Sequence, residues 1–282
     1  MIAPLRARLA LVAAFLVAGV ATARDLRHEP IEFELAQEGR PLRLVGTVIR
    51  PDDAARHPVA VLSHGAWGPA ERRREKPRLD LAPLSTWLAE HGFAVVVPMR
   101  RGYGASEGEV AESSGGCSDP DYARAGQAGA DDILAAARWA RAQDFADPQR
   151  LVLIGYSAGG WGSLAAASRA PDGLVALVNL AGGRGGFSAS GWPCVWSRML
   201  EAATGFARTT RVPSLWLYAR NDALFGPEFA AKLAGAWRLG GAEAELHIVA
   251  PDYEDGHGVF MAAEGVPHWA PVLEPFLAAI GR

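Results

Sequence analysis

Short apolar runs alternate with helical patterns along most of the chain, and this alternation limits the folds that it can adopt. Each run spans only a few residues, which is typical of strands that are buried on both faces of a sheet. The runs that predict strands are residues 31–35, 42–49, 59–62, 93–97, 151–154, 174–180, 214–218 and 245–249. The patterns that predict helices are residues 122–142, 158–168, 227–238 and 269–280. Their order predicts an α/β fold with a mostly parallel central sheet and helices on both faces.

Two segments depart from the alternation. A Glu-Gly-Arg-Pro turn separates residues 31–35 from residues 42–49, so we expect an opening antiparallel hairpin. Residues 182–210 are rich in Gly, Ser, Trp and Arg and lack a strong period, which predicts a short lid inserted after a strand.

The hydrophobic content of 50% over 282 residues is enough for one large core. We therefore assign residues 24–282 to a single domain.

The first residues have the pattern of a secretory signal. Arg6 and Arg8 precede an apolar run over residues 9–20, and the small residues Ala21-Thr22-Ala23 follow it. The apolar run is shorter than the roughly twenty residues of a membrane-spanning helix. We expect residues 1–23 to be a signal peptide that is removed after Ala23, leaving no stable membrane span. The mature protein is then exported, to the periplasm or the medium.

The two cysteines of the chain, Cys117 and Cys194, lie far apart in the sequence. An exported protein meets an oxidising compartment, where they can form a disulfide; the alternative is two unpaired thiols. Neither lies in a cluster with metal-ligand spacing, so we expect no metal site.

The charges of the chain nearly balance. Twenty-eight basic and 31 acidic residues give a formal net charge of −3, which offers no global attraction for nucleic acid. We expect a small-molecule partner instead, and the sequence does not indicate an oligomeric state.

One strand pattern leads directly into a glycine-rich turn and then a helix. Residues 151–154 are followed by Gly155-Tyr156-Ser157-Ala158-Gly159, a G-x-S-x-G pattern. A nucleophilic serine at such a turn needs glycine on either side, because side chains there would collide with the strand and the helix. This context predicts that Ser157 is a nucleophile, whereas the alternative is an incidental glycine-rich turn.

Further motifs accompany this turn along the chain. They are Leu62-Ser63-His64-Gly65-Ala66 and the segments 101–106, 219–222 and 255–258. With these motifs, residues 31–282 resemble the α/β-hydrolase superfamily, particularly its dienelactone-hydrolase-like and serine esterase or peptidase branches. The turn holds serine where dienelactone hydrolases hold cysteine, so we transfer the fold from that branch and not its substrate.

In this superfamily the acid and the histidine follow the nucleophile in that order. Asp222 comes just after the strand predicted at residues 214–218, and His257 lies in a glycine-flanked loop after the last strand. We therefore predict a Ser157–His257–Asp222 triad. Asp252 and Asp255 are competing acids, but they share the loop of the histidine. The alternative role of Asp222 is to cap the following helix.

Acyl transfer also needs backbone N–H donors for the oxyanion, which the resemblance places at Ala158 and Ala66. Trp67 is the alternative to Ala66 by one register. His64 and Gly65 shape this turn, and we expect His64 to supply a supporting hydrogen bond rather than a proton. Trp67, Trp161, Trp192 and Trp196 lie in or beside loops near the expected pocket, where packing is their favoured role.

These residues predict a serine hydrolase that cleaves carboxylic esters or lactones through an acyl-enzyme, without a metal or an organic cofactor. Two alternatives stay open. A serine peptidase acting on short peptides uses the same triad, and a non-catalytic binding protein can keep the same fold.

Overall fold

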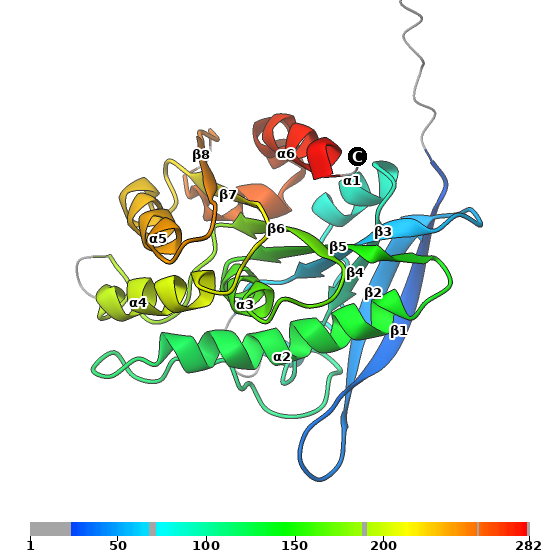
Figure 1. The fold of residues 1–282 in the computed structure, drawn as a ribbon, viewed down its shortest axis with the longest axis horizontal. Helices are drawn as coiled ribbons and strands as arrows, with labels where there is room; N and C mark the ends of the chain where they lie inside the picture. The colour runs from blue at the N-terminus through cyan, green and yellow to red at the C-terminus, as the bar shows by residue number, and fades with distance from the viewer. Residues whose placement is uncertain (1–23, 68–71, 188–190, 253, 281–282) are drawn as a thin grey trace, which may run out of the picture.

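The structure, a computed structural model, describes residues 24–67, 72–187, 191–252 and 254–280; the expected signal peptide, residues 1–23, lies outside them. An eight-stranded sheet in the order β1-β2-β4-β3-β5-β6-β7-β8 crosses the described part of the chain (Figure 1). Its strands are β1 (Leu26–Leu35), β2 (Leu42–Pro51), β3 (His57–Ser63), β4 (Ala94–Pro98), β5 (Ala146–Tyr156), β6 (Leu174–Leu180), β7 (Ser214–Ala219) and β8 (Glu245–Val249). The mostly parallel sheet predicted from the sequence is confirmed.

The first two strands form the expected antiparallel hairpin, in which Leu26 pairs with Pro51 and Leu35 with Leu42. Strand β2 also runs antiparallel to β4, and the pairings from β4 through β3, β5, β6 and β7 to β8 are all parallel. Because the parallel strands all end at the same edge, the loops that follow them are gathered there.

Helices cover both faces of this sheet. They are α1 (Leu84–Glu90), α2 (Tyr122–Arg141), α3 (Ala158–Ala167), α4 (Trp196–Ala207), α5 (Pro227–Leu239) and α6 (Val266–Ile280). Figure 1 shows α1 and α6 on one side of the sheet and α2, α3 and α4 on the other. Helix α5 packs against α4 and β7. The arrangement is the α/β fold expected from the alternating pattern.

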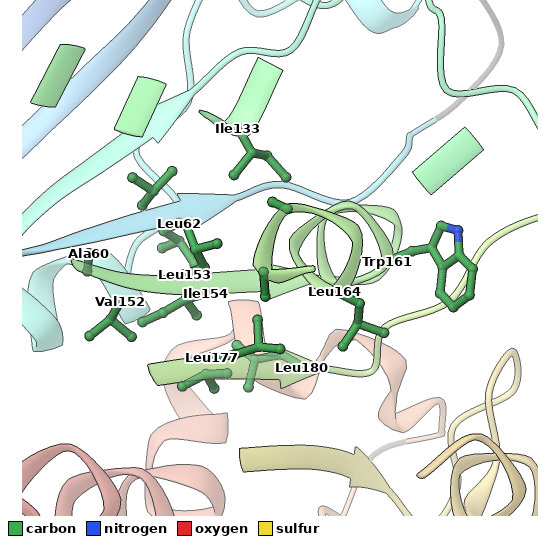
Figure 2. Packing of buried hydrophobic residues seen from close by; sticks show 14 of the residues in the cluster. Ala60, Leu62, Ile133, Val152, Leu153, Ile154, Trp161, Leu164, Leu177 and Leu180 are labelled. Atoms are coloured by element: carbon green, nitrogen blue, oxygen red, sulfur yellow. The ribbon is translucent and has the colours of Figure 1, made fainter. Parts of the chain in front are cut away.

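The centre of the core lies around β5. Leu153 and Ile154 are fully buried there, and so are Leu164 and Trp161 of the following helix α3. Trp161 points away from β5 (Figure 2) and contacts Tyr122 and Phe206. Neighbouring strands cover the edges of β5 and helices cover its faces, so an uninterrupted apolar run suits it better than an alternating one. The strand that leads to Ser157 is therefore held firmly on every side.

The segment predicted as a lid is corrected in its second half. Within residues 182–210 the structure contains α4, whose Met199, Ala203 and Phe206 are buried. These residues recur at helical spacing, but the period covers only three turns and follows a glycine-rich stretch. Residues 196–207 are therefore a crossover helix between β6 and β7. A lid function for the loop before it stays a prediction.

Candidate active site

The backbone at Ser157 turns sharply between β5 and α3. Its φ of +54° and ψ of −121° lie in a region that side-chain-bearing residues rarely adopt. A methyl group at Gly155 would overlap the carbonyl of Gly159, and one at Gly159 would overlap the carbonyl of Ser63. Glycine at these two positions allows β3, β5 and α3 to approach closely enough to hold the turn.

The three predicted side chains meet above this turn. His257 Nε2 lies 3.1 Å from Ser157 Oγ, and His257 Nδ1 lies 2.9 Å from Asp222 Oδ2. Ser157 and His257 are each 9% exposed, and the Asp222 side chain is fully buried. With Nδ1–H donated to the carboxylate, the neutral ring presents Nε2 as an acceptor for the serine hydroxyl.

Asp222 is fixed by its own loop. Its Oδ1 accepts hydrogen bonds from the backbone N–H groups of Leu224 and Phe225, both at 2.8 Å, which leaves Oδ2 for the imidazole. The competing acid Asp255 occupies a different place. Its carboxylate accepts the backbone N–H groups of His257 and Ala223, and so joins the loops after β7 and β8. Sequence reasoning missed this bracing role, which an aspartate two residues before the histidine could have indicated.

A cavity of about 330 Å³ opens beside Ser157. Its wall includes Ala66, Ala158, Arg184, Phe187, Phe225 and residues 113–115. The two expected oxyanion donors thus lie at the cavity with the serine, and Trp67 is not among the residues around it. Ala158 begins α3, so its N–H belongs to the positive end of that helix.

His64 lies behind the cavity wall in a buried polar network. Its Nδ1 donates to Gly65 O at 2.7 Å, and its Nε2 accepts the backbone N–H of Arg100 at 3.2 Å. Burial, together with the neighbouring charge of Arg100, lowers the pKa of His64 to about 3. The ring therefore stays neutral and braces the turn before Ala66.

Arg100 and Glu112 form the charged part of this network, and neither was singled out in the sequence. The Arg100 Nη1 donates to His64 O at 2.6 Å and to Ser63 Oγ at 2.8 Å. Its Nε and Nη2 donate to the two oxygens of Glu112 at 2.6 and 3.0 Å. Burial alone would raise the pKa of Glu112, but the guanidinium groups of Arg100 and Arg184 outweigh it and hold that pKa well below its usual range.

Cys117 and Cys194 form the predicted disulfide, with their Cα atoms 5.1 Å apart. It joins the loop that carries residues 113–115 to the loop that carries Phe187, and both loops line the cavity.

The remaining predictions concern packing and metals. Trp161 is buried and donates its indole N–H to Tyr122 O at 2.8 Å, while Trp192 and Trp196 pack edge to face. Over the described residues, no helix is long and apolar enough to cross a membrane, and no three His, Cys, Asp or Glu side chains gather as metal ligands.

The burial of neutral His64 predicts an acid-sensitive fold. The unfolded chain takes up a proton near pH 6.5, whereas folded His64 resists it down to about pH 3. The free energy of unfolding should therefore fall below pH 6.5, by up to about 1.4 kcal/mol per pH unit. Below about pH 4.5 Glu112 lowers the free energy of unfolding further, because protonation of its carboxylate removes its ion pairs.

Urea unfolding between pH 7.5 and 5 measures this effect. His64→Gln should flatten the pH dependence, and the same change at the exposed His28 should leave it as in the wild type. Equal slopes for all three proteins would show that His64 does not carry the effect.

Comparison with known proteins agrees with this architecture. Residues 38–209 match the family model described as X-Pro dipeptidyl-peptidase (S15 family). No match was found among curated proteins. A putative dienelactone hydrolase from Klebsiella pneumoniae aligns with 91% of this chain and 99% of its own, at 19% identity and a TM-score of 0.57.

Two peptidases have a similar fold. The acylaminoacyl peptidase of Pyrococcus horikoshii aligns with 90% of this chain at 18% identity and a TM-score of 0.61. A puromycin-hydrolyzing peptidase of Mycobacterium tuberculosis aligns with 95% of it at 22% identity and a TM-score of 0.59. The chain spans only 41% of each peptidase. Because the family model covers more than half of the sequence, the chain belongs to the X-Pro dipeptidyl-peptidase (S15) family, and the structural neighbours show that it has the α/β-hydrolase fold.

Proposed function

We propose that this protein is an exported serine hydrolase that cleaves small carboxylic esters or lactones through an acyl-enzyme on Ser157. The observation that carries the proposal is the continuous chain of hydrogen bonds from Asp222 through His257 to Ser157 at the wall of a cavity.

Each residue has a role that follows from its place. Ser157 Oγ attacks the ester carbonyl while His257 Nε2 takes its proton, and Asp222 stabilises the resulting imidazolium. The carbonyl oxygen gains negative charge and accepts hydrogen bonds from the N–H groups of Ala66 and Ala158. His257 then gives its proton to the departing alcohol. In the second half, the same imidazole activates water, which releases the acid and restores Ser157.

A peptidase function is the second candidate, because the family description and two of the structural neighbours name peptidases. One observation favours esters. Among the described residues around the cavity, the charged side chain is that of Arg184, a cation that repels the free ammonium of a peptide N-terminus.

The triad assignment predicts severe losses of turnover. Ser157→Ala and His257→Ala should each lower kcat for an activated ester by several powers of ten, and Asp222→Asn by roughly 10⁴-fold. A fluorophosphonate should label Ser157 in the wild type. Asp252→Asn serves as the control, since Asp252 is exposed and carries the same change of charge. Normal turnover in Asp222→Asn with loss in Asp252→Asn would refute the choice of acid.

The ester assignment predicts a preference between matched substrates. An ester and an amide that share one acyl group differ in the leaving group, and the amide nitrogen must be protonated and held accurately before it departs. We expect kcat/KM to be much higher for the ester, with both activities lost in Ser157→Ala. A higher kcat/KM for the amide would favour the peptidase instead.

Export predicts a defined mature end. When the full chain is expressed in a secreting bacterial host, N-terminal sequencing of the exported fraction should begin at Arg24. Ala23→Arg should block cleavage, because the site requires a small residue. Recovery of the uncut wild-type chain from the cytoplasm would contradict the proposal.

A further inference from the structure

The cavity beside Ser157 carries one sign of charge. Among the described residues around it, Arg184 has the only charged side chain, which is 11% exposed. The other polar contributions come from Ser113, Ser114 and backbone groups of glycines. A cation at the wall of a half-enclosed site is poorly screened by water, so it acts strongly on whatever fills the cavity.

The buried charges behind Arg184 do not balance. Arg184 Nη1 donates to Glu112 Oε1 at 3.0 Å, but Glu112 also makes a two-pronged ion pair with Arg100. The hydroxyl of Tyr103 donates to the same carboxylate at 2.9 Å. Two guanidinium groups thus share one carboxylate, and neutral His64 adds no charge.

The nearby carboxylates are committed elsewhere. Asp222 accepts hydrogen bonds from His257 and from N–H groups of its own loop, and Asp132 is paired with Arg101, at 2.7 Å from its Nε. The cluster of Arg100, Arg184 and Glu112 therefore keeps one unit of positive charge at the cavity wall. Because Arg100 already neutralises Glu112, the Glu112 carboxylate cannot also neutralise the charge of Arg184. Instead, Glu112 holds the guanidinium in place and uses only part of its five N–H donors.

The cavity lies on the acyl side of the nucleophile. A departing alcohol must reach His257 Nε2 to be protonated, yet His257 does not line the cavity. Ala66 and Ala158, the proposed oxyanion donors, do line it. Arg184 follows Gly183, whose N–H donates to Ser157 O at 3.2 Å, so it belongs to the part of the wall next to the serine.

We propose that Arg184 binds a free carboxylate on the acyl group of the substrate, so that the preferred substrates are monoesters of short dicarboxylic acids. This inference rests on the proposed function. A guanidinium held from behind presents paired N–H donors that match a carboxylate, and little side-chain freedom is lost on binding. In the reaction, the acyl group with its free carboxylate is transferred to Ser157 Oγ, and the alcohol leaves. Water then cleaves this acyl-enzyme and releases the dicarboxylic acid.

A pair of chromogenic esters of the same shape tests the charge. In 4-nitrophenyl hemisuccinate the acyl chain ends in a carboxylate, and in 4-nitrophenyl levulinate a neutral acetyl group takes its place. We expect the wild type to prefer the hemisuccinate in kcat/KM by roughly 10- to 100-fold, as for a hydrogen bond to a charged group. Arg184→Gln should bring the ratio of the two values close to one. Arg184→Lys keeps the positive charge but lacks the planar pair of N–H donors, so it should give an intermediate ratio.

Arg220→Gln is the matched control. Arg220 is exposed, lies just after β7 and two residues before Asp222, and the change removes the same charge. Arg220→Gln should keep the preference for the hemisuccinate. If both glutamine variants lose this preference to a similar extent, it comes from the overall electrostatic field, and a carboxylate site at Arg184 is overturned. Cleavage of both esters at similar kcat/KM by the wild type, with dependence on Ser157, would overturn the subsite while the proposed function stands. If neither ester is cleaved and the fluorophosphonate leaves Ser157 unlabelled, the proposed function fails and the subsite with it.

Discussion

Ser157 keeps its unusual backbone conformation because β3, β5 and α3 are packed too closely for another path. Such a conformation costs on the order of 1–3 kcal/mol, which the surrounding fold must offset. The fully buried Leu153 and Ile154 of β5 anchor the strand before the turn, and Trp161 anchors the helix after it. Gly159 lies against the carbonyl of Ser63, so the same contact also fixes the end of β3, from which the chain continues to Ala66. This one close contact therefore fixes the positions of both Ser157 and the turn that carries Ala66.

A second constraint acts from behind the cavity. Arg100 holds the carbonyl of His64, Glu112 holds Arg100, and Glu112 also holds Arg184. A buried ion pair contributes little stability by itself, because desolvation of its charges offsets their attraction. What the network contributes here is the fixed position of the side chains and carbonyls that it joins. The network links the turn before Ala66 to the opposite wall of the cavity, so the site and the pocket keep a fixed relation to each other.

The sequence predicted most of the fold because parallel strands that are buried on both faces leave short apolar runs, as in β5. Ser157, Asp222 and His257 could be named because the turn requires glycines and the three follow a fixed chain order. Glu112 and Arg184 could not, since they lie in loops without a period and meet across 72 residues of sequence. Helix α4 was missed because its short apolar stripe follows a glycine-rich loop. Local patterns find regular elements and turns, whereas long-range charge pairing needs the fold itself.

The disulfide has a topological consequence for the site. Cys117 and Cys194 lie on either side of Ser157 in the sequence, so Ser157, with β5, α3 and β6, belongs to a closed covalent ring. A single cut by a protease within this ring leaves both pieces attached to each other, with Glu112 and Ser157 still on one molecule. The ring also keeps the two loops at the cavity as chain neighbours when the rest of the fold has opened. After one such cut, Ser157, Arg184 and Phe187 therefore stay covalently joined to the cavity loop of residues 113–115.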